Sequence, residues 1–471
     1  MIAEIGLILL RIFTYLAAFY LVIVASFYLL FFIFSSVQLR SHYRLDENEP
    51  YEELLTSSFT KPVSILVPAF NEEAGIIGSV RSLLSINYPD FEVIVINDGS
   101  TDKTLETMTA AFSMVKVGRK VIRRRLETKE VKGVYRSTLY ENLYMIDKEN
   151  GGKSDALNAG INLSLFPYIC SLDGDSIIER DAFLKVMKPI VDSDGEVIAA
   201  GGSVRIANNC HIERGELMQV GLSKNPLIIL QVVEYLRAFL MGRVGLSRHN
   251  LLLIVSGAFG IFNKEWVVEA NGYRTDTVGE DMELVVHLHR LIREKGENKR
   301  IEYIPEPVVW TEAPESLRIL RRQRSRWHRG LFQSLWLHKK MLFNPKYGTI
   351  GIISMPSYFI VELLGPIVEL FGYLLIILSP FMSGVYVKGA LLLFLLLLLY
   401  GSLLSMSAVL LEEWSIRRYP NVSQIIKLFF WSLTESFWYR PLTVIWRVEG
   451  LIQVLQKNNQ WGKMTRKGIS K

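Results

Sequence analysis

The stretch KPVSILVPAF, residues 61–70, decides the fold of this chain. Its central apolar side chains follow one another with almost no alternation with polar ones. Three later stretches have the same character: FEVIVINDGS (91–100), YICSLDGDS (168–176) and EVIAAGGSVRI (196–206). Continuous apolar runs of this length are typical of strands that are covered on both faces.

Helical patterns separate these runs, among them EEAGIIGSVRSLLS (72–85) and KSDALNAGINLSL (153–165). The alternation over residues 61–310 predicts an α/β domain with a largely parallel, Rossmann-like sheet. Ligands of such sheets bind beyond the carboxyl ends of the strands. The acidic residues at those ends are Asp98, Asp173 and Asp175.

The composition fits a chain that is partly soluble and partly embedded in lipid. Half of the 471 residues are hydrophobic, only 21% are charged, and the formal net charge is +6. This excess suits anionic lipid and an anionic nucleotide, and no basic stripe interleaved with aromatic residues suggests nucleic acid. The two cysteines cannot form a disulfide framework. No CxxC or HExxH spacing occurs, so no structural zinc site is expected.

Long apolar segments flank the α/β domain. Residues 7–34 predict a retained membrane helix, and the basic QLRSHYR that follows favours a cytoplasmic side for the large domain. Residues 350–381 and 385–411 are each long enough to span a bilayer. Residues 425–455 are apolar but carry charged side chains, among them Glu435, Arg440, Arg447 and Glu449, so their topology stays open.

Five regions are therefore predicted. They are an N-terminal transmembrane helix (1–40), the α/β domain (55–335), an amphipathic interfacial helix (336–348), C-terminal transmembrane and interfacial helices (349–456) and a basic tail (457–471). The basic stretch 118–140 interrupts the α/β pattern. It suits a solvated surface excursion, or a loop that touches lipid headgroups or a polymer.

Two motifs lie at the ends of the first two strands. VPAFNEE (67–73) can place Pro68 and Ala69 against a flat base and Glu72 near a ribose hydroxyl. NDGS (97–100) offers Asp98 to a uracil imide or a ribose. A structural turn and an Asx turn, respectively, are the alternatives.

Metal and phosphate are indicated by two further motifs. DGD (173–175) follows an apolar strand, and Asp173 and Asp175 can together bind one Mg²⁺ or Mn²⁺. GGKSDALN (151–158) opens a helix, where its glycines and Lys153 can take a phosphate. An ordinary helix start is the alternative.

Two motifs in the second half of the domain are candidates for binding a ligand and for accepting a proton from it. VSGAFGIF (255–262) is a small-residue bend between apolar positions, and its residues Ser256, Gly257, Ala258 and Phe259 suit close approach to a ligand, or a tight packing corner. GED (279–281) begins a helix, where Asp281 can take a proton from a hydroxyl, whereas Glu280 is expected to be structural. His287 and His289, further along, are expected to be core or surface histidines rather than ligands.

The stretch RILRRQRSRW (318–327) places an amide, a guanidinium and an indole on one short basic helix. A sugar stacks well on an indole, and a diphosphate fits an arginine fork. A basic helix attracted to anionic lipid is the alternative, but it does not explain the Gln-x-x-Arg-Trp spacing. The three residues are Gln323, Arg326 and Trp327.

In this order, the motifs resemble those of family-2 glycosyltransferases of GT-A fold, above all the processive membrane-bound synthases of cellulose, chitin, hyaluronan and poly-N-acetylglucosamine. The resemblance covers residues 61–335, with GED where cellulose-type enzymes have TED. It implies that Asp98 and Asp173 bind uridine diphosphate, Asp175 the metal, and that Asp281 is the general base. Gln323, Arg326 and Trp327 would hold the diphosphate and the acceptor sugar, and Lys153 and residues 256–259 would line the two sites.

The resemblance thus implies an inverting, metal-dependent glycosyltransferase at the cell membrane, with its catalytic domain in the cytoplasm. The donor would be UDP-glucose or UDP-N-acetylglucosamine, and the acceptor a growing β-linked polysaccharide. Membrane lipid and an export or accessory subunit are expected partners. A transferase that adds one sugar to a lipid acceptor, and a non-catalytic membrane scaffold, are the alternatives.

Overall fold

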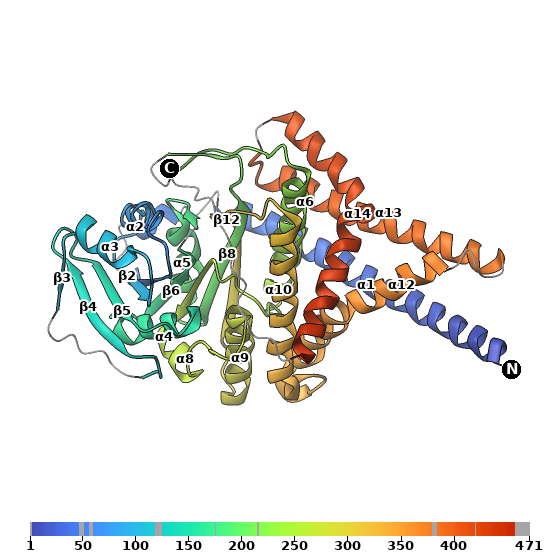
Figure 1. Cartoon of the computed structure of the whole chain (residues 1–471), viewed down its shortest axis with the longest axis horizontal. Helices are drawn as coiled ribbons and strands as arrows, with labels where there is room; N and C mark the ends of the chain where they lie inside the picture. Colours follow the sequence, from blue (N-terminus) through green and yellow to red (C-terminus); the bar gives the residue numbers. More distant parts are fainter. Residues whose placement is uncertain are drawn as a thin grey trace.

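A ten-stranded mixed sheet forms the centre of the α/β domain (Figure 1). The computed structural model describes residues 2–46, 51–55, 60–117, 125–174, 176–213, 216–378, 384–419 and 421–456. In spatial order the strands are β3 (Met114–Lys116), β4 (Val131–Ser137), β5 (Leu143–Lys148), β2 (Phe91–Asp98), β1 (Val63–Ala69), β6 (Tyr168–Leu172), β11 (Phe259–Asn263), β8 (Val197–Ile206), β12 (Arg300–Thr311) and β7 (Ile177–Ile178).

The sequence correctly predicts the centre of this sheet. Strands β5, β2, β1 and β6 run parallel to one another, and β12 runs parallel to β8. The strands β1, β2, β6 and β8 are almost entirely buried, as their continuous apolar runs predict. Antiparallel pairs extend the sheet at both sides, and β9 (His211–Glu213) and β10 (Glu216–Gln219) form a separate ribbon.

Helices cover the sheet and connect its strands. α4 packs on β1 and β2, and α5 packs on β8 and β12. The helices of this domain are α2 (Ile76–Leu84), α3 (Thr104–Ala111), α4 (Lys153–Leu163), α5 (Ala182–Asp192), α6 (Pro226–Tyr235), the π-helix η2 (Leu236–Arg243), α7 (Val244–Ser247), α8 (Lys264–Glu269), α9 (Glu280–Lys295) and α10 (Leu317–Leu337). A short 3₁₀ helix, η1 (Tyr51–Leu55), precedes the sheet.

Two segments differ from the expectation. The basic stretch 118–140 contains the strand β4, which pairs with β5 and β3, so its second half belongs to the sheet; residues 118–124 lie outside the described ones. The expected helix over 336–348 is wrong, because α10 ends at Leu337 and only the 3₁₀ turns η3 (Lys339–Met341) and η4 (Pro345–Tyr347) follow. Pro345 and the left-handed backbone of Phe343 (φ 55°) prevent a continuous helix there.

Three helical stretches in the described part of the chain are long and apolar enough to cross a membrane: Tyr15–Ser41, Ile350–Leu378 and Phe394–Ser415. The first lies within α1 (Ile2–Asp46). The second combines η5 (Ile350–Ser354), α11 (Met355–Ser357), η6 (Tyr358–Leu363) and α12 (Gly365–Leu378), and the third lies in α13 (Gly384–Ser415).

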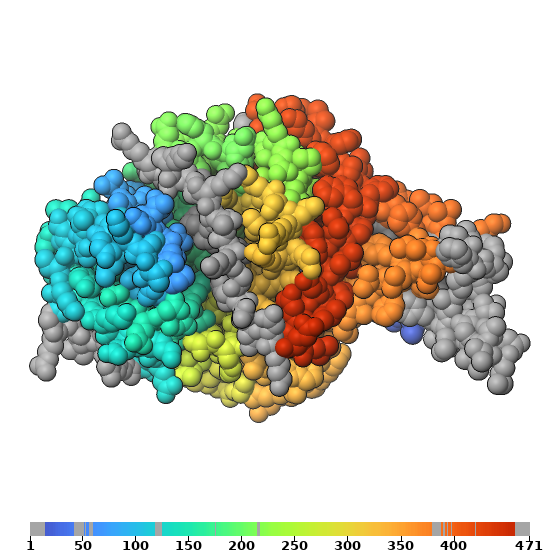
Figure 2. All heavy atoms as spheres, viewed as in Figure 1, coloured from blue at the N-terminus to red at the C-terminus, as the bar shows by residue number. Residues whose placement is uncertain are grey.

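The last apolar segment, whose topology the sequence leaves open, is one long helix, α14 (Val422–Leu455). It packs along α10, and Figure 2 shows the two side by side on one face. Two of its arginines pair with acidic residues of the preceding apolar segment: Arg440 binds Glu369 at 2.8 and 2.9 Å, and Arg447 binds Glu362 at 3.2 Å.

The α/β domain and the apolar helices share one hydrophobic core, which includes Leu39 of α1, Ala408 of α13 and Leu428 of α14. Ion pairs also cross the junction. Arg205 of β8 lies 2.5 Å from Glu412 of α13, and both are buried. This packing fixes the sheet relative to the helices that flank it.

Candidate functional site

The carboxyl ends of β1, β2 and β6 meet at one edge of the sheet. In the register of the parallel pairs, Ala69 lies opposite Asn97, so Pro68 and Ala69 lie beside the NDGS turn. β6 ends at Leu172, and Asp173 follows directly. Ser79 of α2 donates a hydrogen bond to the Gly174 carbonyl at 2.7 Å, which holds this turn near β1; Asp175 lies outside the described residues.

Three hydrogen bonds from the protein hold Asp98 at this edge. Its Oδ1 accepts from Lys148 Nζ at 2.7 Å and from the Gly151 N–H at 3.0 Å, and its Oδ2 accepts from the Gly152 N–H at 2.8 Å. Gly152 has a φ of 87°, which side-chain-bearing residues rarely adopt. Asp98 therefore fixes the loop that leads into α4 and, with it, the position of Lys153.

Lys153, at the start of α4, is the centre of the site. Its Nζ lies 2.7 Å from Asp173 Oδ1, 3.3 Å from Glu280 Oε1 and 3.4 Å from the Gly257 carbonyl. Burial by itself would lower the pKa of Lys153, but the carboxylates of Asp173 and Glu280 outweigh it and raise that pKa. The ammonium group is therefore a fixed positive charge among carboxylates.

Asp281 joins this cluster from the first turn of α9. Its Oδ2 accepts the Gly257 N–H at 2.9 Å, and its Oδ1 accepts the Met282 N–H at 2.8 Å. The bend of Ser256, Gly257 and Ala258 leads into β11, where Phe259 lies opposite Leu172 of β6. The antiparallel pairing of β11 with β6 thus brings the bend, Asp173 and Asp281 together.

Glu280, for which the sequence predicts a structural role, lies beside Asp281 in the same cluster. Its side chain is buried in the cluster, and burial followed by the charge of Asp281 raises its pKa, against the opposing effect of Lys153. No spacing signal distinguishes it from its neighbour, since two adjacent carboxylates at a helix N-terminus are common.

The Gln-x-x-Arg-Trp motif lies on α10. The side chain of Ser316 caps this helix by accepting the Ile319 N–H. Trp327 is 44% exposed, and the Arg324 guanidinium covers its ring at 4.3 Å. Arg324 is in turn buried and pairs with Glu234 of α6 at 2.7 Å. Gln323 accepts a hydrogen bond from Arg324 at 3.0 Å, and Arg326 is half-buried.

α10 is docked onto the start of α9. Gln333 Oε1 accepts the Val278 N–H at 3.0 Å, and the Ser334 hydroxyl donates to the Gly279 carbonyl at 3.4 Å. Arg326 and Trp327 lie about one helical turn before Gly330, which contacts Gly279. The Gln-x-x-Arg-Trp motif is therefore held beside the helix that carries Asp281.

The residues of the cluster suit a divalent cation. The carboxyl groups of Asp173, Glu280 and Asp281 lie around one ammonium group, that of Lys153. Hard cations prefer carboxylate oxygens. Asp173 is the described member that also lies on the DGD turn and remains partly exposed.

Most of the predicted site residues therefore either contact one another or lie at the same edge of the sheet. A chain of contacts links Asp173 to Lys153, Lys153 to Gly257 and Gly257 to Asp281, and Pro68, Ala69 and Asp98 lie at the ends of the neighbouring strands. Glu72 lies in the turn after β1, where its N–H donates to Thr104 at 3.0 Å.

Comparisons with known proteins identify the family and the fold. The family model described as Glycosyl transferase family 2 matches residues 64–267, and that described as Glycosyl transferase family group 2 matches residues 168–411, more than half of the chain. A mannosyltransferase from Pyrobaculum calidifontis, solved with GDP-Man and Mn²⁺, has a TM-score of 0.51 at 15% identity and covers 91% of this chain and 100% of its own. This likeness concerns the fold, and it agrees with the predicted α/β class.

Two curated relatives are similar in sequence. The poly-beta-1,6-N-acetyl-D-glucosamine synthase of Staphylococcus aureus (strain COL) is 28% identical over 271 residues, 57% of this chain and 54% of that protein. The synthase of the same name from Staphylococcus epidermidis is 26% identical over 306 residues, 63% of this chain and 62% of that protein. The chain thus spans less than two thirds of either relative's length.

Proposed function

The chain belongs to the family-2 glycosyltransferases, and from this premise we propose that it extends a β-linked polysaccharide at a membrane, one sugar at a time, from a UDP-sugar. The observation that carries the proposal is the contact of Lys153 with Asp173 and Glu280, beside Asp281. A transferase needs a site for a diphosphate and its metal next to a base, and this cluster offers both.

Asp281 is the proposed general base. The amides of Gly257 and Met282 orient its carboxylate. Asp281 accepts the proton of the acceptor hydroxyl as that oxygen attacks the anomeric carbon of the donor. The bond from this carbon to the diphosphate breaks, UDP leaves with the electron pair, and the configuration inverts.

The donor side is the carboxyl edge of the sheet. Pro68, Ala69, Glu72 and Asp98 are proposed to receive the nucleoside, and Lys153 the diphosphate. Mg²⁺ or Mn²⁺, held by Asp173 and Asp175, would offset the charge of the leaving diphosphate. Lys153 supplies a fixed positive charge beside it.

The acceptor side is formed by α10 and the bend over residues 256–259. The exposed ring of Trp327 suits stacking against the terminal sugar, and Arg326 and Gln323 suit contacts with the diphosphate. The candidate membrane helices and the basic residues after the first of them support a multi-pass protein whose catalytic domain faces the cytoplasm. An export or accessory subunit is a further proposed partner.

A panel of nucleotide sugars tests this function. Purified full-length protein in lipid nanodiscs is incubated with Mn²⁺ and each donor, and released UDP is measured. The names of the curated relatives make UDP-N-acetylglucosamine the first donor to test, followed by UDP-glucose. We expect UDP release with one of them and long products on a gel.

The product size separates the alternatives. Products that carry a single added sugar would instead favour a transferase acting on a lipid acceptor. Tight nucleotide binding without turnover of any donor would favour a non-catalytic scaffold.

A further inference from the structure

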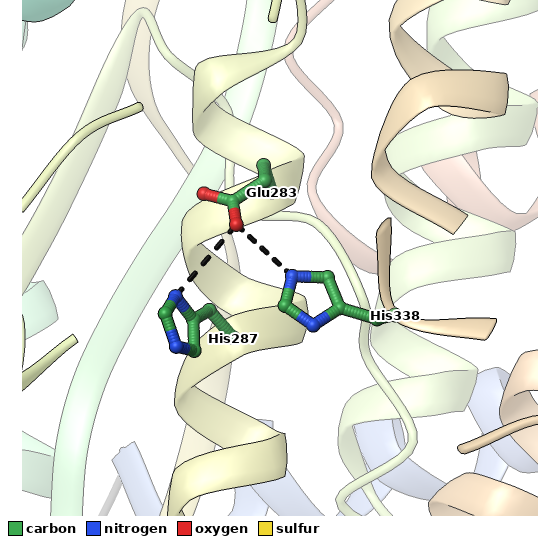
Figure 3. Close-up of side chains that lie close together, drawn as sticks. All are labelled: Glu283, His287 and His338. Carbon is green, nitrogen blue, oxygen red and sulfur yellow. Dashed lines mark hydrogen bonds and ion pairs between the residues drawn. The ribbon is translucent and has the colours of Figure 1, made fainter. Parts of the chain in front are cut away.

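Three side chains outside the proposed catalytic cluster converge between α9 and α10: Glu283, His287 and His338 (Figure 3). Glu283 and His287 lie one helical turn apart on α9, and His338 directly follows the last residue of α10. Their ligand atoms all lie within 4.8 Å of one another. Two imidazoles and one carboxylate from two helices thus face a common point.

The distances suit one tetrahedral ion. Glu283 Oε1 lies 3.0 Å from His338 Nε2 and 3.7 Å from His287 Nδ1. In a zinc site with bonds of about 2.0–2.2 Å, neighbouring ligand atoms lie about 3.4 Å apart. The two distances that involve Glu283 lie on either side of that value. Small side-chain rotations of the two histidines would bring all three ligand atoms to one ion.

Internal hydrogen bonds leave this cluster incomplete. Glu283 and His338 are buried, yet Glu283 Oε2 and His287 Nδ1 have no hydrogen-bond partner in the described structure. Buried polar atoms without partners are uncommon in folded proteins, because each one loses its hydration. Figure 3 shows the interacting nitrogen of each imidazole turned toward the Glu283 carboxylate.

The charged groups around the cluster and its exposure to solvent are compatible with a cation. The guanidinium groups of Arg274 and Arg290 oppose a positive charge on His287. Each of them is paired with a carboxylate: Arg274 lies 2.5 Å from Asp276, and Arg290 lies 3.0 Å from Glu294. The His287 side chain is 23% exposed, so solvent reaches one side of the cluster. A water molecule can therefore supply a fourth ligand.

We propose that Glu283, His287 and His338 form a binding site for a divalent transition-metal ion of the zinc class, separate from the proposed Mg²⁺ or Mn²⁺ of the sugar-transfer reaction. Two imidazoles and a carboxylate are a common zinc ligand set, whereas Mg²⁺ prefers oxygen ligands throughout. The sequence gives the opposite expectation, because no HExxH or CxxC spacing is present and the third ligand lies far along the chain.

The ion joins the two helices of the proposed acceptor side. α9 carries Asp281 on its first turn, and α10 carries Trp327. These helices already contact each other at Gly279 and Gly330. A metal bond between Glu283, His287 and His338 would lock them at a second point, near the end of α10. The site is thus a brace, and none of its ligands takes part in the proposed reaction.

Zinc content per chain tests the proposal directly. Full-length protein without a histidine tag is equilibrated with zinc sulfate, desalted and measured by inductively coupled plasma mass spectrometry. We expect one zinc per chain for the wild type and loss of that zinc in His287→Ala and His338→Ala. In the cobalt-loaded wild type we expect the visible absorption bands of tetrahedral Co²⁺, and we expect them to be absent from both variants.

Two variants serve as controls. His211→Ala removes a histidine from an exposed His–Glu pair, which joins His211 to Glu213 at 2.9 Å, and should retain the zinc. Asp173→Asn should also retain it, which separates this ion from the one proposed for catalysis. If His338→Ala fails to fold, the partly exposed His287→Gln still reports on the site.

Several results would overturn the proposal. They are a wild type that retains no zinc, equal zinc in wild type and His287→Ala, or loss of zinc in Asp173→Asn. All these readouts are independent of turnover, so failure of the proposed glycosyltransferase activity would not be mistaken for failure of the zinc site.

Discussion

Gly330 of α10 and Gly279, which precedes α9, are in backbone contact: a Cβ on Gly330 would lie 2.9 Å from the Cα of Gly279. Only glycine allows this approach, which holds Arg326 and Trp327 beside the helix of Asp281. Gly330→Ala should therefore separate the helices even though alanine favours a helix. We expect a loss of about 1–3 kcal/mol in stability, as for overpacked cores, and lower sugar transfer.

Thermal unfolding in detergent and UDP release measure both effects of Gly330→Ala. Gly372→Ala is the matched control, because Gly372 is also helical and an added Cβ would meet no atom within 4 Å. Equal behaviour of the two variants would show that the contact with Gly279 is unimportant.

Asp173→Asn should weaken nucleotide binding in the presence of Mn²⁺. The substitution removes a proposed metal ligand and the carboxylate that lies 2.7 Å from Lys153. We expect the affinity for UDP, measured by isothermal titration calorimetry, to fall more than about tenfold, or about 1.4 kcal/mol. Asp192→Asn, which alters a half-exposed pair with Lys188, should bind UDP normally. Unchanged binding by Asp173→Asn would remove Asp173 from the donor site.

Arg324→Met should destabilise the protein strongly. It leaves the Glu234 carboxylate, which also accepts the Tyr439 hydroxyl at 2.6 Å, without its cation. Removing one partner of a buried pair costs about 3–5 kcal/mol. On the same helix, Arg321→Met breaks an exposed pair with Glu449, which should cost less than about 1 kcal/mol. Similar melting temperatures for the two variants would contradict this ranking.

His289 should make stability depend on pH. Its Nε2 donates to the Leu252 carbonyl at 2.8 Å, and burial lowers its pKa to about 4. Between about pH 6.5 and 4 the unfolded chain takes up a proton that the folded chain does not, so acid favours unfolding. The contribution of roughly 3 kcal/mol is present above pH 6.5 and lost as the pH falls to 4.

Melting curves between pH 7 and pH 4 check the role of His289. His289→Gln keeps a donor for Leu252 but does not titrate, so its stability should fall less steeply with acid than that of the wild type. The same dependence of stability on pH in the two proteins would contradict this role of His289.

The centre of the fold and much of the site follow from local sequence. Continuous apolar runs identify β1, β2, β6 and β8, and a parallel sheet then places Asp98 and Asp173 at one edge. Local pattern also predicts Lys153 as a candidate phosphate ligand, because glycines before a helix are a recognisable phosphate motif.

The remainder depends on contacts between distant segments. The strand β4 lies in a basic, polar stretch, and only its pairing with β5 makes it a strand. Glu280 enters the site because Lys153, more than a hundred residues earlier, approaches it. His338 meets Glu283 only through the docking of α10 on α9, which neither sequence segment encodes alone.

Sugar transfer by Asp281→Asn tests the central claim most directly. Turnover should fall by about 10²–10⁴-fold, because the amide cannot take the proton of the acceptor hydroxyl, while the affinity for UDP stays unchanged. Asp276→Asn, which alters an exposed pair with Arg274, should keep full turnover. Near-normal turnover of Asp281→Asn with the donor that the wild type uses would contradict the account.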